Sequence, residues 1–185
     1  MHKDIQNLKA IVQQLQGKIH TQEQTIEKFA TQEYLEVDTI SHKGRAAEPI
    51  CLPHDPYLGS PITNDYYASV YGMEYQDNFG SNVYNKDVPC AVCRANHVTS
   101  KVMIPGKVKC YAGWRKEYGG ILVAGLDRHD GSSSFICVDK NQDVLEAGAG
   151  NEDGYLIYPA IAKCGSLKCP PYVQDTRISC VVCTK

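Results

Sequence analysis

The residues whose type and spacing could do chemistry in this chain are its cysteines. Nine occur among 185 residues, and none precedes position 51. Such a density is typical of metal sites in an intracellular protein or of a disulfide framework in a secreted one, and the spacing favours disulfides. Because the number is odd, at least one thiol is free, bonded to another subunit, or bonded to a further segment. The disulfide candidates are Cys51, Cys90, Cys93, Cys110, Cys137, Cys164, Cys169, Cys180 and Cys183.

Two similar motifs, at residues 90–93 and 180–183, each hold two cysteines separated by two residues. Four thiolates are a ligand set that zinc accepts, but zinc-binding turns differ from these valine-containing stretches, and the gap between the motifs is long. A redox motif of this kind belongs at the start of a helix, and no such helix is apparent. In an extended strand the two cysteines point to opposite faces, which predicts disulfides to different partners.

A third cluster spans Cys164 to Tyr172 and contains a glycine and two adjacent prolines, which predict a rigid turn. Cys164 and Cys169 could close a local loop, or each could pair elsewhere in the chain. The sequence alone leaves both arrangements open.

Motifs for catalysis are missing. The chain has no nucleophile elbow, no zinc-protease helix motif and no phosphate-binding glycine loop. His97, His129 and Asp130 are isolated from other groups that could act with them. We therefore expect a protein that is not an enzyme and that has no catalytic residues, no metal and no cofactor.

Composition narrows the class of protein further. A hydrophobic fraction of 43% supports a packed core, and a net charge of −2 without a basic stripe argues against nucleic-acid binding. No apolar run is long enough to span a membrane. The first residues, Met1 to Asp4, lead into a polar segment and not into an apolar leader, so we expect that a secretion signal would precede this sequence.

Residues 1–30 have the pattern of a coiled coil. Apolar side chains recur every three and four residues over nearly four heptads, and no proline interrupts them. The expected oligomerisation seam consists of Ile5, Leu8, Val12, Leu15, Ile19, Gln22, Ile26 and Phe29. Asp4 faces Lys9, and Lys18 faces Glu23, in a parallel arrangement, and both pairs attract.

The number of strands in this coiled coil is less constrained. Branched residues at the first seam position with leucine at the second favour a dimer, whereas Ile11 widens the apolar stripe as higher oligomers require. Gln22 is a polar seam residue that would set the register of the helices. An alternative is a helix that packs on its own domain, although this seam is narrower than a globular helix face.

Residues 31–49 are expected to form a connector with a short strand at 34–40, and residues 50–185 a cysteine-rich β domain. Short runs rich in branched and aromatic residues alternate there with Gly, Pro, Asn and Asp. We expect a mainly β fold, a disulfide-braced sandwich or barrel-like head that follows an N-terminal α-helical coiled coil. The expected strands lie at 66–71, 102–104, 120–124, 134–138, 154–158 and 177–182.

An ordered series of short motifs covers the chain from about residue 50 to its end. The motifs are Cys51–Pro56, Tyr71–Gln76, Val88–Cys93, Met103–Lys107, Cys110, Gly113–Trp114, Glu117–Tyr118, Cys137–Asp139, Cys164–Tyr172 and Cys180–Lys185. With them the sequence resembles the C-terminal non-collagenous domain of sponge short-chain collagens and related secreted proteins of marine invertebrates. The resemblance implies an extracellular domain on an oligomerising stalk, as a trimer in preference to a dimer, with a matrix or adhesion role.

The chain departs from this family because it has no Gly-X-Y repeats, so its coiled coil would supply the assembly instead. Our first hypothesis is a secreted, oligomeric structural or adhesion protein that forms a matrix or fibre, with other matrix proteins or glycans as partners. The alternative is a multivalent carbohydrate-binding or innate-immune recognition protein, in which linked weak sites act together. Trp114 and nearby tyrosines are the sugar-binding candidates for that alternative.

Overall fold

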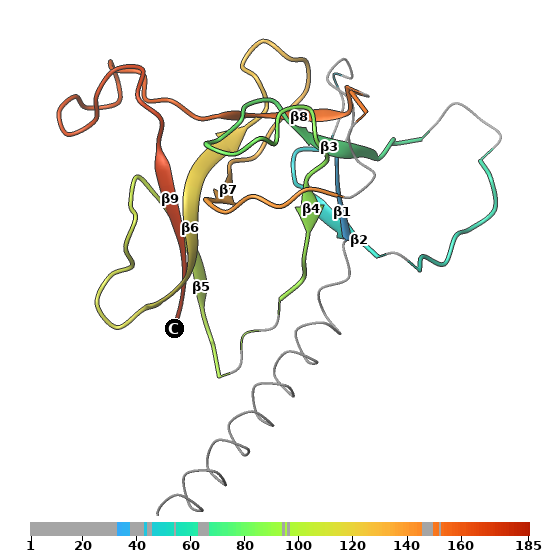
Figure 1. Cartoon of the computed structure of the whole chain (residues 1–185), viewed down its shortest axis with the longest axis horizontal. Coiled ribbons are helices and arrows are strands. Elements are labelled where there is room, and N and C mark those ends of the chain that lie inside the picture. The colour runs from blue at the N-terminus through green and yellow to red at the C-terminus, as the bar shows by residue number, and fades with distance from the viewer. Residues whose placement is uncertain are drawn as a thin grey trace, which may run out of the picture.

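The computed structural model describes residues 33–37, 43, 46–53, 55–62, 67–93, 95, 97–145, 150–151 and 153–185. Within these residues the chain forms nine strands and no helix (Figure 1), which confirms the mainly β prediction. The coiled coil expected at residues 1–30 lies outside the described residues. The strands are β1 (Glu33–Val37), β2 (Ile50–Leu52), β3 (Tyr71–Tyr75), β4 (Pro89–Cys90), β5 (Lys101–Pro105), β6 (Arg115–Ala124), β7 (Ile136–Asp139), β8 (Tyr155–Pro159) and β9 (Ser179–Thr184).

The strands are linked through backbone pairing in the order β2-β1-β3-β8-β6-β9-β5, with β4 beside β1 and β7 beside β6. All these pairs are antiparallel except β3 and β8, which run parallel. The ten-residue strand β6 pairs with β7, β8 and β9, so it is the centre of the larger part of the sheet. Two of the four cysteine-bearing strands, β7 and β9, pair with it, and the other two, β2 and β4, pair with β1.

Strand β1 lies within the segment 31–49, where the sequence predicts a connector with a short strand. Its backbone pairs with β2, where Leu35 is opposite Cys51, and with β3, where Glu36 is opposite Gly72. It also pairs with β4, where Glu33 is opposite Cys90. Because it pairs with three strands, β1 is an internal strand of the sheet and not only part of a connector.

One expected strand is wrong in its position. The run at 66–71 was expected to be a strand that ends before Gly72, but β3 begins at Tyr71 and continues through Gly72 to Tyr75. Tyr67 and Val70 are exposed, whereas Met73 and Tyr75 are buried. The burial of the later side chains therefore decides where the strand lies, even though a glycine such as Gly72 weakens a strand interior.

The hydrophobic core is built mainly from β3, β6, β7 and β8, together with the turn that follows β3. Its buried residues are Met73, Tyr75, Phe79, Val83, Val88, Val123, Val138, Tyr155 and Ile157. Three consecutive residues of β3 are buried, so both faces of this strand are covered. Glu74 is only 2% exposed, and its Oε1 accepts a hydrogen bond of 3.4 Å from the backbone N–H of Gly154.

The buried Tyr75 makes the protein less stable at alkaline pH. Its hydroxyl donates to the backbone oxygen of Asp143 at 3.2 Å, and burial, with a smaller effect of the Asp143 charge, raises its pKa well above the ordinary value. Above about pH 10 the tyrosine ionises in the unfolded chain while the folded one keeps its proton. Stability is therefore fully present below that pH and is lost above it, by about 1.4 kcal/mol per pH unit.

We expect Tyr75→Phe to reduce this alkaline loss of stability, which urea unfolding at pH 9 and pH 11 would measure. Tyr84→Phe is the matched control, because Tyr84 is 53% exposed. An equal loss of stability for Tyr75→Phe and Tyr84→Phe between the two pH values would contradict the assignment to Tyr75.

Candidate functional site

Eight of the nine predicted disulfide candidates are paired in the structure. The bonds join Cys51 to Cys90, Cys110 to Cys183, Cys137 to Cys180, and Cys164 to Cys169. Cys93 is free and exposed. The odd cysteine that the composition requires is therefore Cys93, and the local loop between Cys164 and Cys169 is the arrangement that occurs.

The two similar cysteine motifs differ in how their cysteines are bonded. In β9, Cys180 bonds Cys137 and Cys183 bonds Cys110, which confirms the prediction of two different partners for this motif. In the other motif, Cys90 bonds Cys51 and Cys93 has no partner cysteine, so the prediction is wrong there. The physical reason is that β4 ends at Cys90, so Cys93 lies beyond the strand in an exposed segment.

These bonds leave no four-thiolate zinc site, because three of the four motif cysteines are already oxidised. Within the described ranges, no three His, Cys, Asp or Glu side chains are grouped so that they could hold a metal ion. Burial, with a smaller effect of the Asp139 charge, raises the pKa of Tyr118 in β6.

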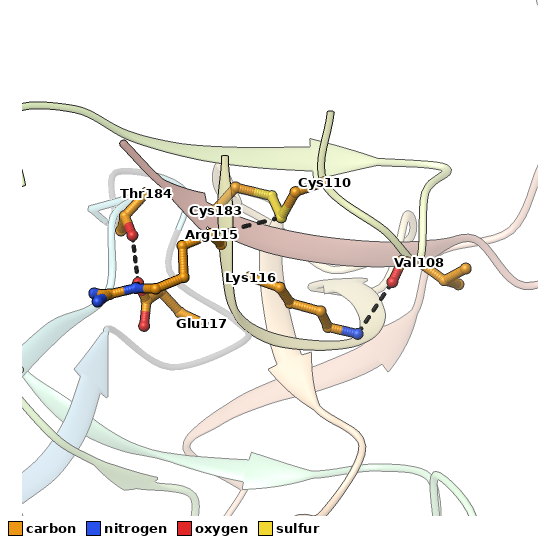
Figure 2. The surroundings of a disulfide bond; sticks show 7 residues. All are labelled: Val108, Cys110, Arg115, Lys116, Glu117, Cys183 and Thr184. Atoms are coloured by element: carbon orange, nitrogen blue, oxygen red, sulfur yellow. Dashed lines mark hydrogen bonds and ion pairs between the residues drawn. A yellow bond between two sulfur atoms is a disulfide. The ribbon is translucent and has the colours of Figure 1, made fainter. Parts of the chain in front are cut away.

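Figure 2 shows how the disulfide between Cys110 and Cys183 ties the loop after β5 to the sheet. Cys183 is fully buried in β9, and the Cys110 sulfur lies 3.7 Å from the carbonyl oxygen of Arg115. The Nζ of Lys116 donates to the carbonyl of Val108 at 3.0 Å. The disulfide and this charge-assisted hydrogen bond hold the loop to β9 and β6, together with a hydrogen bond from the Gly106 N–H to the Ser179 carbonyl at 2.7 Å.

Glu117 lies beside this disulfide at a bulge in β6, where the register with β9 shifts between Lys116 and Tyr118 (Figure 2). Its Oε1 accepts hydrogen bonds from the Thr184 hydroxyl and from Arg115 Nε, the latter at 2.8 Å. These two donors, Thr184 first, hold the pKa of Glu117 below its usual value. A carboxylate kept ionised in this way links β6 to the end of β9 and is poorly suited to proton transfer near neutral pH.

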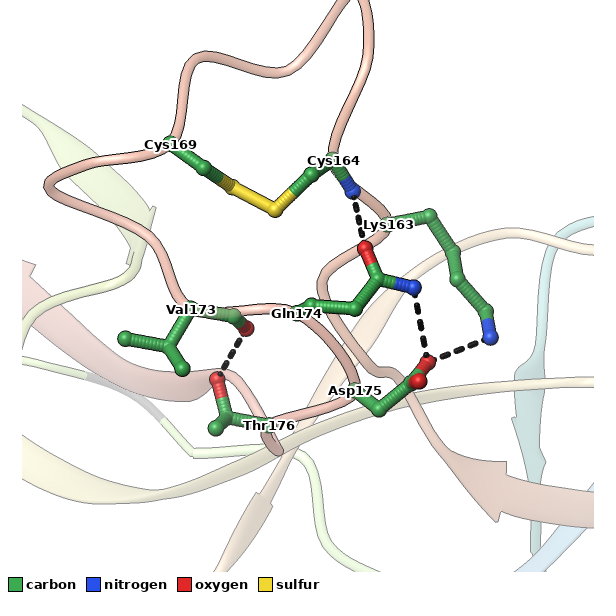
Figure 3. Close-up of polar contacts among 7 residues, drawn as sticks. All are labelled: Lys163, Cys164, Cys169, Val173, Gln174, Asp175 and Thr176. Atoms are coloured by element: carbon green, nitrogen blue, oxygen red, sulfur yellow. Dashed lines mark hydrogen bonds and ion pairs between the residues drawn. A yellow bond between two sulfur atoms is a disulfide. The ribbon is translucent and has the colours of Figure 1, made fainter.

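Figure 3 shows the loop that the Cys164–Cys169 disulfide closes. At its base, the side-chain oxygen of Gln174 accepts from the backbone N–H of Cys164 at 2.6 Å, and its amide nitrogen donates to Asp175 at 3.2 Å. Lys163 forms an ion pair with the same Asp175 carboxylate, whose pKa is lowered by that lysine first. The base of the loop is therefore held by polar contacts as well as by the disulfide.

The connection between β2 and β3 exposes large apolar side chains, and Figure 1 shows its described parts standing away from the strands. The most exposed is Tyr57, at 104%, followed by Leu58, at 87%. The others are Ile62, Tyr67 and Val70. The apolar loop, as we call residues 57–62 and 67–70, was missed in the sequence, although Pro53, Pro56, Gly59 and Pro61 around it signal a turn-rich segment without burial. Apolar side chains gathered on one exposed segment are typical of a contact surface.

The expected oligomerisation residues of the seam lie outside the described residues, so the structure places none of them. The part of the chain that the structure describes contains no helix long and apolar enough to cross a membrane. No family model matches this sequence, and neither do curated proteins or solved structures.

Proposed function

We propose that this chain is a secreted structural or adhesion protein that assembles as an oligomer, a trimer in preference to a dimer, into an extracellular matrix or fibre. The proposal rests first on the apolar loop, because Tyr57 and Leu58 are nearly fully exposed on a head that has its own core. Exposed apolar surface of this kind favours contact with another protein. The coiled-coil seam at residues 5–29 would gather the copies, as the sequence pattern predicts.

The four disulfides support the extracellular part of the proposal, since such bonds persist in oxidising compartments. All strands except β6 are short, with lengths of two to six residues. The disulfides brace these strands and so compensate for limited pairing. The resemblance to the heads of sponge short-chain collagens points to the same matrix role. The coiled coil takes the place of the collagen repeats that this chain does not have.

The test is the mass of the full chain in solution by light scattering, with Cys93 alkylated to exclude disulfide exchange. We expect a trimer, three times the 20.5 kDa of one chain. Leu8→Asp with Leu15→Asp places charge in the seam and is expected to reduce the mass to that of a monomer. Asn7→Asp with Gln14→Asp adds the same charge outside the seam and is the matched control, which should remain trimeric.

The apolar loop is tested in the same experiment. Tyr57→Ser with Leu58→Ser should leave the trimer intact and abolish its further growth into larger particles at high concentration, because only the contact between heads is removed. A full chain that is monomeric from the start, or a seam variant that keeps its trimer mass, would rule out assembly through the coiled coil.

A multivalent carbohydrate-binding protein is the second candidate, supported by tyrosines on the surface of the head. Tyr57, Tyr67 and Tyr84 are more than half exposed, and aromatic side chains with a polar tip suit sugars as well as proteins. Trp114, the other sugar-binding candidate, is half-buried. Selective binding on a glycan array by the trimer, lost in Tyr57→Ser, would favour this candidate over a matrix role.

A further inference from the structure

The free thiol of Cys93 is a nucleophile that the fold leaves available. The other eight cysteines are bonded in disulfides, and residues 91–93 are exposed and follow the end of β4. A thiolate attacks a disulfide sulfur and forms a new disulfide, while the other sulfur leaves. The question is which of the four disulfides can serve as the acceptor.

Burial and loop length distinguish these four disulfides. Cys180 and Cys183 are fully buried and their partners Cys137 and Cys110 are half-buried, so these two bonds are less accessible to a second protein than a bond with an exposed cysteine. Cys51 and Cys90 are half-buried and join segments 39 residues apart. The bond between Cys164 and Cys169 closes only five residues, and Cys164 is exposed. It is the most accessible of the four, and it contributes least to holding distant segments together.

The base of this loop is held independently of its disulfide. Backbone hydrogen bonds join Ala162 to Asp175 at 2.8 Å and to Thr176 at 2.9 Å. The Gln174 side chain holds the N–H of Cys164, and the Thr176 hydroxyl donates to the Val173 carbonyl at 2.7 Å (Figure 3). Opening the disulfide therefore leaves the neighbouring strand ends in place.

The donor and the acceptor lie in different parts of the head. Figure 1 shows the segment between β8 and β9, which carries the loop, at one corner, and the segment that follows β4 well away from it. Cys93 and the Cys164–Cys169 bond of the same chain are thus not placed to react together. A bond between copies that joins two different surfaces is heterologous, and such contacts produce open chains unless the rotation closes a ring.

We propose that Cys93 of one copy attacks the Cys164–Cys169 disulfide of a second copy and links the two chains covalently without an oxidant. The proposal deepens the assembly role above and rests on it, because the copies must first be brought together. It adds a chemical activity, disulfide exchange, and identifies both partners as this chain.

The atoms and electrons of the step balance. Cys93 loses its proton to solvent, and its sulfur bonds the exposed Cys164 sulfur of the second copy. The bond from Cys164 to Cys169 breaks, its electron pair goes to the Cys169 sulfur, and that thiolate takes up a proton. The exposed Lys168 beside Cys169 is a positive charge that favours the departure of this thiolate. One disulfide is lost and one is formed, so the number of free thiols stays at one per chain on average, with none added to the donor and Cys169 released on the acceptor.

The experiment follows the full chain under nitrogen with a metal chelator, transferred from acidic to mildly alkaline pH and then quenched with an alkylating reagent. We expect a ladder on a non-reducing gel that extends beyond dimers, at a constant count of one thiol per chain. Peptide mapping should find Cys93 joined to Cys164 and the alkyl label moved to Cys169. The rate should rise with pH because the thiolate is the nucleophile.

Two variants separate donor from acceptor. Cys93→Ser keeps only the acceptor, and Cys164→Ser with Cys169→Ser keeps only the donor, so neither should form a ladder alone. A mixture of the two should stop at a product of one chain each. If the double variant does not fold, alkylation of Cys93 in the native chain should prevent the ladder in the same way.

Several outcomes would overturn the exchange. One is the formation of dimers alone while the thiol count falls to zero, because that result indicates oxidation of two Cys93 thiols to a disulfide. Another is an alkyl label that stays on Cys93. Label movement to Cys169 without any covalent link between chains on the gel would assign the reaction to a single chain and would also overturn it. The light-scattering mass of Cys93→Ser tests the assembly role separately, because a trimer of that variant leaves the proposed function intact when exchange fails.

Discussion

Replacing both Cys110 and Cys183 by alanine should lower the free energy of unfolding by about 4 kcal/mol. The bond joins residues 73 apart, and the loop-closure entropy that it removes from the unfolded chain corresponds to about that amount. Cys183 is also fully buried, so the loss of its sulfur leaves a gap beside β6. The loop after β5 would then be held by hydrogen bonds, from Lys116 to Val108 and from Gly106 to Ser179.

The measurement is urea unfolding, followed by the fluorescence of Trp114, the single tryptophan, which lies between Cys110 and β6. Cys93 is alkylated beforehand so that disulfides do not exchange during unfolding. Cys164→Ala with Cys169→Ala is the matched control, because its loop of five residues corresponds to about 2 kcal/mol on the same scale. Equal losses in the two double variants would contradict this role for loop length.

Gly120→Ala should cost about 3 kcal/mol or more, because β6 and β7 approach each other too closely at this position for any side chain. A Cβ at Gly120 would lie 1.8 Å from the carbonyl oxygen of Val138 and 2.8 Å from the carbonyl carbon of Asp139. Both are backbone atoms of the paired strand, so β7 must move away from β6. Val138 belongs to the core, and its displacement extends the effect beyond the pairing.

Gly72→Ala is the control for this substitution. Gly72 is also a strand glycine, but a Cβ there meets nothing within 4 Å, so stability should change by less than about 0.5 kcal/mol. Urea unfolding gives the free energies, and amide exchange of β7 should show faster exchange in Gly120→Ala alone. A Gly120→Ala protein with the stability of Gly72→Ala would mean that the close approach of the two strands is not a constraint.

The sequence predicted the class of the fold well where local pattern and burial agree. The run of branched residues between Cys180 and Cys183 is expected in a strand, and β9 lies there with five of its six residues buried. The run at 66–71 was placed too early because its tyrosines and valine suit a strand equally well. Local preference could not show that Met73 and Tyr75 would be the residues that reach the core.

The cysteine motifs show the same limit. Their spacing predicted that disulfides would form, and their odd number that at least one cysteine would be free, bonded to another subunit, or bonded to a further segment. Which cysteine stays free depends on which strands become neighbours, and β4 ends before Cys93.

By itself, the sequence of this protein determined a mainly β, disulfide-forming head, because strand period, turn residues and cysteine number are local properties of the chain. Only the tertiary structure decided the pairing of Cys51 with Cys90, the exposure of Tyr57 and Leu58, and the separation of Cys93 from the Cys164 loop. These features depend on contacts between residues that are far apart in the chain, where many pairings satisfy the same local pattern and the packing of the whole selects one.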